Sequence, residues 1–116
     1  MHNRGKGNLY EDKTVHTLIE KGFVILDRNY LCKLGEIDII AKDEAVLVFI
    51  EVKYRMNDKY GHPSESINYY KKKHILNTAK WYVKEKRYYD RAIRFDVAIW
   101  FEGKLEYYKG AFDYNG

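Results

Sequence analysis

Glu51 and Lys53 stand where the sequence predicts the end of a buried strand. They follow five consecutive apolar residues, 46–50, in the segment GEIDIIAKDEAVLVFIEVKYR. Because side chains alternate between the two faces of a strand, Glu51 and Lys53 are expected to be neighbours on one face. A carboxylate and an ammonium group held side by side by a rigid strand could bind a divalent cation and orient a water molecule.

The strand expected just before it brings a second acid. Alternation places Asp38 and Ile40 on one face of that strand and Ile37 on the other. A hairpin that buries its apolar sides consistently would place Ile40 on the same face as Phe49. That register predicts that Asp38 lies beside Glu51.

A helix near the start of the chain brings a third acid. Glu11 lies four residues before Val15 and therefore on the apolar stripe that should face the sheet. Gathering Glu11, Asp38 and Glu51 costs free energy through repulsion and desolvation unless a cation intervenes. Oxygen ligands of this kind suit Mg²⁺, which would lower the pKa of a bound water and neutralise charge on a phosphate. The chemistry indicated is phosphodiester hydrolysis, with Lys53 orienting or activating the water.

The hydrophobic pattern predicts a single α/β domain over residues 1–116 in the order αβββαββ, with a mixed central sheet flanked by helices. Residues 1–7 are expected to be a flexible tail. The parallel pair should be the strands that the second helix connects. The expected elements are helices over 8–21 and from about 68, and strands over 23–30, 34–41, 46–54, 92–100 and 104–108.

Composition narrows the class of protein. The chain has 116 residues, of which 46% are hydrophobic and 33% charged, as in a folded globular domain. Its net charge of +4 favours polyanionic partners only weakly. No apolar run is long enough to cross a bilayer, no export signal is evident, and Cys32 is the single cysteine, so a cytoplasmic location without membrane association is expected. The four histidines show no zinc-ligand spacing.

Four segments together resemble a known family. GEIDIIA, LVFIEVKYR with its Glu-x-Lys core, RFDVAIW and GAF are similar to the YraN family of predicted bacterial endonucleases. That family is placed in the PD-(D/E)xK superfamily, which includes restriction enzymes and Holliday-junction resolvases. The resemblance covers residues 9–112 and implies a restriction-endonuclease-like fold. It also implies a nuclease that uses Mg²⁺ or Mn²⁺ and acts on nucleic acid, DNA more than RNA, with branched DNA one candidate. A homodimer is a further option, since resolvase-like relatives act as dimers.

The resemblance also assigns roles to individual residues. Asp38 and Glu51 stand at the metal-binding positions of the superfamily, and Lys53 stands at its lysine. Glu11 matches the helical glutamate of the resolvase-like branch. The backbone carbonyl of Val52 is implied as a further metal ligand.

Several neighbouring residues have two readings each. Glu36 is either another ligand or ligand partner, or a solvated acid at a strand end. Arg55 either meets a phosphate or forms a salt bridge at the rim. Asp96 is expected to be structural and to pair with Arg94 or Lys71. The lysines at the start of the second helix either contact a nucleic-acid backbone or form a solvated face; these are Lys71, Lys72 and Lys73.

Two rival functions remain open at this point. A nucleic-acid-binding module could keep the nuclease fold without cleaving its ligand. A protein-interaction domain could use the same acids in a structural ion-pair network, and it would show no salt-sensitive binding of DNA.

Overall fold

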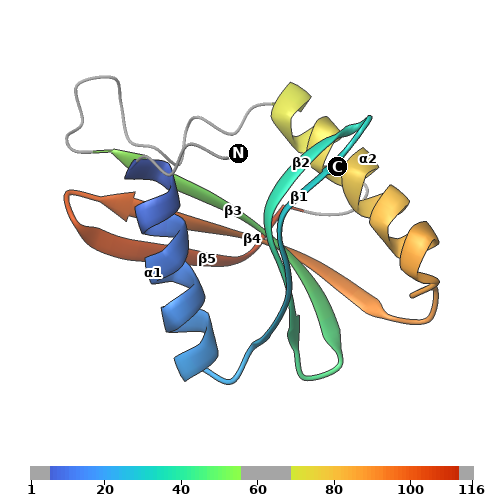
Figure 1. Ribbon diagram of the computed structural model, residues 1–116, viewed down its shortest axis with the longest axis horizontal. Coiled ribbons are helices and arrows are strands. Elements are labelled where there is room, and N and C mark those ends of the chain that lie inside the picture. The colour runs from blue at the N-terminus through green and yellow to red at the C-terminus, as the bar shows by residue number, and fades with distance from the viewer. Residues whose placement is uncertain (1–5, 56–68, 113–116) are drawn as a thin grey trace.

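The computed structural model describes residues 6–55 and 69–112. The elements follow the predicted order, and Figure 1 shows the two helices on opposite sides of one twisted sheet. They are α1 (Lys6–Glu20), β1 (Val24–Cys32), β2 (Gly35–Asp43), β3 (Val46–Arg55), α2 (Tyr69–Lys86), β4 (Ala92–Phe101) and β5 (Lys104–Phe112).

The five strands form one mixed sheet in the order β1-β2-β3-β4-β5. The pair β3 and β4 is parallel and the other three pairs are antiparallel, which confirms the prediction that α2 connects the parallel strands. Ile40 lies opposite Phe49, so the predicted hairpin register is also confirmed. The charged end of β3 therefore projects from the middle of the sheet.

Alternation along β3 divides the core into two layers. Leu47 and Phe49 pack with the apolar stripe of α2. Val48 and Ile50 pack with Leu18 of α1 on the other face. Because both faces are covered, the apolar run at the start of β3 is buried on both sides, as its sequence indicates.

Some boundaries differ from those expected. β1 continues through Leu31 and Cys32, which were assigned to a loop, and β5 extends to Phe112. α1 begins at Lys6, so the last two residues of the expected tail are helical. Residues 56–68, at the end of which the second helix was expected to begin, lie outside the described residues.

The length and polarity of the two helices bear on whether the chain could span a membrane. Within residues 6–55 and 69–112, no helix is long and apolar enough to cross a membrane.

Candidate metal and phosphate site

The site begins where β2 separates from β3. Their pairing runs from Asp43 opposite Val46 to Ile39 opposite Ile50. Past this point the N–H of Val52 donates to Oδ2 of Asp38, with 2.8 Å between the two atoms. The Asp38 side chain thus lies between the two strands and is fixed by the backbone of β3.

The side-chain alternation of β1 reverses at the same level. Arg28 bonds Glu11 of α1, whereas Tyr30, two residues later, donates to Glu85 of α2, so these two side chains lie on opposite faces of the sheet. Asn29 between them has a φ of 52°, in the left-handed region that asparagine tolerates better than most residues. This single left-handed residue therefore reverses which face of the sheet the following side chains of β1 occupy.

The paired strand β2 reverses with it. Tyr30 pairs with Ile37 and Arg28 with Ile39, so Asp38 lies across from Asn29. Ile37 packs in the α2 layer with Ile40, while Ile39 packs in the α1 layer. The expectation that Ile37 faces away from Ile40 was wrong, because strict alternation stops at Asp38.

Asp38 and Glu51 share one partly desolvated site. The pKa of Asp38 is raised to about 8, chiefly by burial and then by the negative charge of Glu51, against the lowering effect of the Val52 N–H. A hydrogen bond between the two carboxyl groups contributes as well, with the protonated Asp38 donating. Near neutral pH Asp38 therefore keeps its proton, as expected for a buried acid beside a second carboxyl group.

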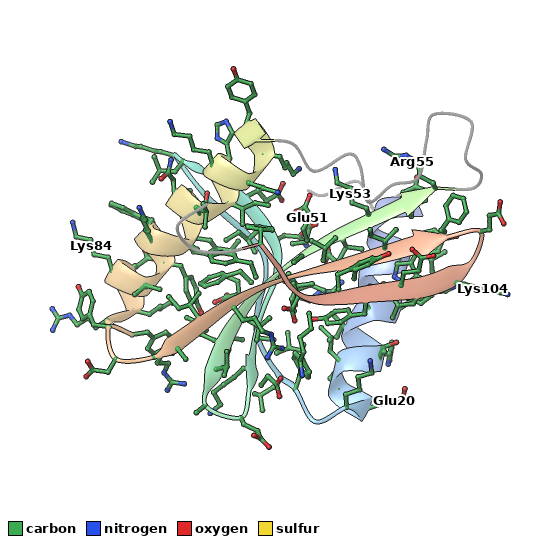
Figure 2. All side chains as sticks on the ribbon, turned by 180° about the vertical axis from the view of Figure 1, so that it is seen from behind. Glu20, Glu51, Lys53, Arg55, Lys84 and Lys104 are labelled. Carbon is green, nitrogen blue, oxygen red and sulfur yellow. The ribbon has the colours of Figure 1, made fainter. Side chains whose placement is uncertain are left out.

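Two lysines contact Glu51. Nζ of Lys71 lies 2.9 Å from Oε2 of Glu51, and Nζ of Lys53 lies 3.8 Å from the same oxygen. Burial lowers the pKa of Lys71, but the hydrogen bond and charge of Glu51 outweigh it and the pKa is raised overall. The pKa of Lys53 is lowered, chiefly by burial and then by the positive charges of Lys71 and Arg55. Figure 2 shows Glu51, Lys53 and Arg55 in succession along the end of β3.

Glu11 is buried, as its place on the apolar stripe predicts, with 4% of its surface exposed. Its Oε1 accepts hydrogen bonds from Nη2 of Arg28 at 2.9 Å and from Nδ2 of Asn29 at 3.1 Å. Its charge also raises the pKa of Asp38, though less than that of Glu51 does. Glu11 is thus held by β1 and acts on Asp38 through its charge.

The acidic side chains of the site determine which metal ion it could hold. Within the described part of the chain, no three His, Cys, Asp or Glu side chains converge in a way that could hold a metal ion. Asp38 and Glu51 nevertheless provide two adjacent carboxylates. Mg²⁺ commonly takes one or two carboxylates and fills its other positions with water and substrate oxygens. The carboxylates of Asp38 and Glu51 meet that requirement, and Glu11 influences Asp38 through its charge.

The remaining predicted site residues surround this pair. Arg55 is partly buried, and its Nη1 donates to the carbonyl of Tyr54. Glu36 is exposed, and its charge contributes to the raised pKa of Lys71. Lys72 is partly buried with its Nζ 5.8 Å from the centre of the Phe112 ring, and Lys73 is exposed.

Asp96 belongs to a separate network. Its carboxylate accepts hydrogen bonds from Arg94, from the hydroxyl of Tyr107 and from the N–H of Gly110. The pairing with Arg94 is one of the two that the sequence allowed. Because each of these contacts joins β4 to itself or to β5, Asp96 helps to hold the edge of the sheet together.

Three contributors to the site were missed from the sequence. Arg28 and Asn29 lie in a segment read only as a strand, although an asparagine inside a strand is unfavourable and could have indicated a break. Lys71 was expected either to contact a nucleic-acid backbone or to lie on a solvated face, and its contact with Glu51 could not be foreseen from spacing because the intervening chain is long.

The chain is similar to one protein family over most of its length. Residues 10–99 match the model of the family described as "Uncharacterised protein family UPF0102". A UPF0102 protein of Fusobacterium nucleatum is 43% identical over 109 residues, which cover 94% of this chain and 92% of that protein. One from Lachnoclostridium phytofermentans is 42% identical over 117 residues, 100% of this chain and 99% of its own. The matched region includes all four residues of the predicted site, and the chain belongs to the UPF0102 family, also called the YraN family.

Proposed function

We propose that this protein is a Mg²⁺- or Mn²⁺-dependent nuclease of the cytoplasm, with a restriction-endonuclease-like arrangement and with DNA as its substrate. The observation that supports this most directly is the pairing of Asp38 and Glu51 where β2 leaves β3, with Lys53 at its edge. Both strands are fixed by two-sided packing, which is the rigidity that a hydrolytic site requires.

The residues divide the work as follows. Asp38 and Glu51 would hold the cation, together with the carbonyl of Val52. When bound, the cation would lower the pKa of a coordinated water and neutralise charge on the phosphate. Lys53, whose pKa is lowered, would orient that water. Arg55, two residues further along the same strand, would meet the phosphate.

Cleavage of DNA tests the proposal. Linear, branched and single-stranded DNA would be incubated with Mn²⁺ and the wild-type, Glu51→Gln and Lys53→Met proteins. We expect cleavage by the wild type and a loss of at least about a hundredfold in each variant. Glu20→Gln and Lys21→Met are matched controls, because both residues are exposed and Figure 2 shows Glu20 far from the charged end of β3. Cleavage that persists in both site variants contradicts the proposal.

The alternative is a nucleic-acid-binding module that does not cleave. The ion pair between Lys71 and Glu51 favours it, because that lysine already neutralises one of the two carboxylates. Calorimetric titration with Mn²⁺ separates the two functions. Metal uptake that Glu51→Gln abolishes supports the nuclease, whereas salt-sensitive DNA binding without metal uptake supports the module.

A further inference from the structure

A hollow of about 370 Å³ lies between the β1–β2 turn and the outer side of α2. Its lining is mainly apolar and comes from Cys32, Lys33, Leu34 and Trp81. The volume falls within the range of small-ligand sites, roughly 300 to 1,000 Å³. None of the interactions described for Glu51 and Asp38 involves any of these four residues.

The turn is held firmly against α2. Nδ1 of His74 lies 3.3 Å from the carbonyl oxygen of Leu34, which accepts its hydrogen bond. Gly35 has a φ of 151°, and a Cβ there would lie 2.8 Å from Oγ1 of Thr78. Because only glycine permits this approach, the shape of the hollow is fixed by the fold.

An aromatic ring forms one wall of the hollow. Trp81 is 44% exposed although tryptophan is usually well buried, and Leu34 beside the hollow is also 44% exposed. Nζ of Lys84 lies 5.8 Å from the centre of the Trp81 ring, close enough for a cation–π contact. A flat apolar wall next to a cation is suited to a planar ligand that is attached to negative charge.

The surroundings of the hollow are basic. α2 carries only one acid, Glu85, and that side chain accepts a hydrogen bond from Tyr30. Exposed lysines recur along the helix at intervals of seven and four residues, and Lys33 in the turn is exposed as well; these helical lysines are Lys73, Lys80 and Lys84. A second copy of this chain would bring the same lysines face to face, which disfavours it as the occupant.

The hollow and the candidate site are connected by one helix. Lys71, which contacts Glu51, precedes Trp81 by ten residues, or about 15 Å along the helix axis. A strand lying along α2 could therefore reach both places within a few nucleotides.

We propose that the hollow binds one unpaired base of a single-stranded nucleic-acid segment, stacked on Trp81, while the lysines of α2 contact its phosphates. This rests on the proposed function in one respect, because it names the part of the substrate that the protein grips beside the cleavage site. Stacking on an aromatic side chain tolerates any base, so the hollow gives a preference for unpaired structure rather than for sequence.

Binding without cleavage tests the inference. Fluorescence anisotropy with a labelled oligothymidylate, in EDTA, would compare the wild type with Trp81→Leu and Trp81→Phe. We expect Trp81→Leu to weaken binding about fivefold to a hundredfold and Trp81→Phe to retain most of it. Tyr108→Leu is the matched control, since that ring is 41% exposed on β5 and should leave affinity unchanged. Quenching of tryptophan fluorescence by the oligonucleotide, lost in Trp81→Phe, gives a second readout.

Charge provides an independent measurement. Lys84→Gln should reduce the slope of log affinity against log salt by about 0.7, the value for one phosphate contact on a single strand. Lys104→Gln should leave the slope unchanged, and Figure 2 shows Lys84 and Lys104 at opposite ends of the molecule.

The outcomes separate this inference from the nuclease proposal. Unchanged affinity in Trp81→Leu overturns the inference, and so does an equal loss of affinity for blunt duplex DNA. A change in sedimented mass in Trp81→Leu with unchanged DNA affinity would overturn it too, and would assign the hollow to a second copy. Trp81-dependent binding by a protein that cleaves nothing in Mn²⁺ would uphold the inference while the nuclease proposal fails.

Discussion

Nζ of Lys71 lies 2.9 Å from Oε2 of Glu51, so the start of α2 contacts the end of β3. The same carboxylate is in contact with Asp38 of β2. Three elements therefore meet at one carboxyl group. A divalent cation that binds Glu51 must compete with the ammonium group of Lys71 for its negative charge.

Removal of that competing charge should strengthen metal binding. We expect Lys71→Gln to bind Mn²⁺ about two- to fivefold more tightly than the wild type at low salt, because a partly exposed ion pair is worth up to about 1 kcal/mol. Isothermal titration calorimetry measures the change, and Lys72→Gln, from a side chain directed at Phe112, is the control. Weaker Mn²⁺ binding in Lys71→Gln would mean that the lysine assists the site instead.

The raised pKa of Asp38 makes stability depend on pH. The unfolded chain loses this proton near pH 4, whereas the folded protein keeps it until about pH 8. Its contribution to stability is therefore complete below pH 4 and falls as the pH rises toward 8. Asp38→Asn cannot ionise, and its amide oxygen can still accept the Val52 N–H.

Asp38→Asn should thus be more stable than the metal-free wild type at pH 8.5, by about 1–3 kcal/mol, and closer to it at pH 5. Urea denaturation at the two pH values measures the free energy of unfolding. Asp90→Asn, at an exposed turn, should follow the wild type at both. A wild type that loses no stability between pH 5 and 8.5 relative to Asp38→Asn would show that Asp38 is already ionised in the folded protein at pH 5.

The order of elements and the hairpin register could be predicted because they depend on local signals. The continuous apolar run of β3 indicates burial on both faces, and Ile40 can bury itself with Phe49 in only one register. The prediction that Asp38 lies beside Glu51 follows from that register. The predictions of element order and hairpin register needed no knowledge of how distant segments meet.

Contacts that depend on a departure from regular structure could not be predicted in this way. The reversal at Asn29 changes the face of each residue beyond it, and alternation carries no sign of such a change. The assumption of regular alternation placed Ile37 on the wrong face and concealed the contacts of Arg28 and Asn29 with Glu11. The hydrogen bonds of Glu11 depend on this one backbone angle.

The buried carboxylate of Glu11 should make Arg28 important for stability. Arg28→Met leaves that charge with Asn29 as its remaining donor in this group, and we expect a loss of about 2–4 kcal/mol in the free energy of unfolding. The double variant Arg28→Met with Glu11→Gln should recover part of this loss, since no unpaired charge then remains. Chemical denaturation measures both.

Asp12 offers the matched control for that cycle. It also bonds Arg28, but its side chain is 40% exposed. Asp12→Asn should therefore cost less than about 1 kcal/mol. If Asp12→Asn and Arg28→Met were equally destabilising, the effect would come from the surface pair and not from the buried Glu11.

Asn29 should link backbone conformation to the metal site. Asn29→Gly keeps the left-handed φ but loses the hydrogen bond to Glu11, whereas Asn29→Val loses the bond and strains the backbone by a further 1–2 kcal/mol or so. We expect stability to fall in the order wild type, Gly, Val, and Mn²⁺ affinity to fall most in Val because Asp38 lies across from this residue. Glu102 has a φ of 51° in the β4–β5 turn, so Glu102→Val should cost comparable stability with unchanged Mn²⁺ affinity. Equal Mn²⁺ affinities in Asn29→Gly and Asn29→Val would show that Asp38 keeps its place without the reversal, and that the packing of Ile37 alone positions it.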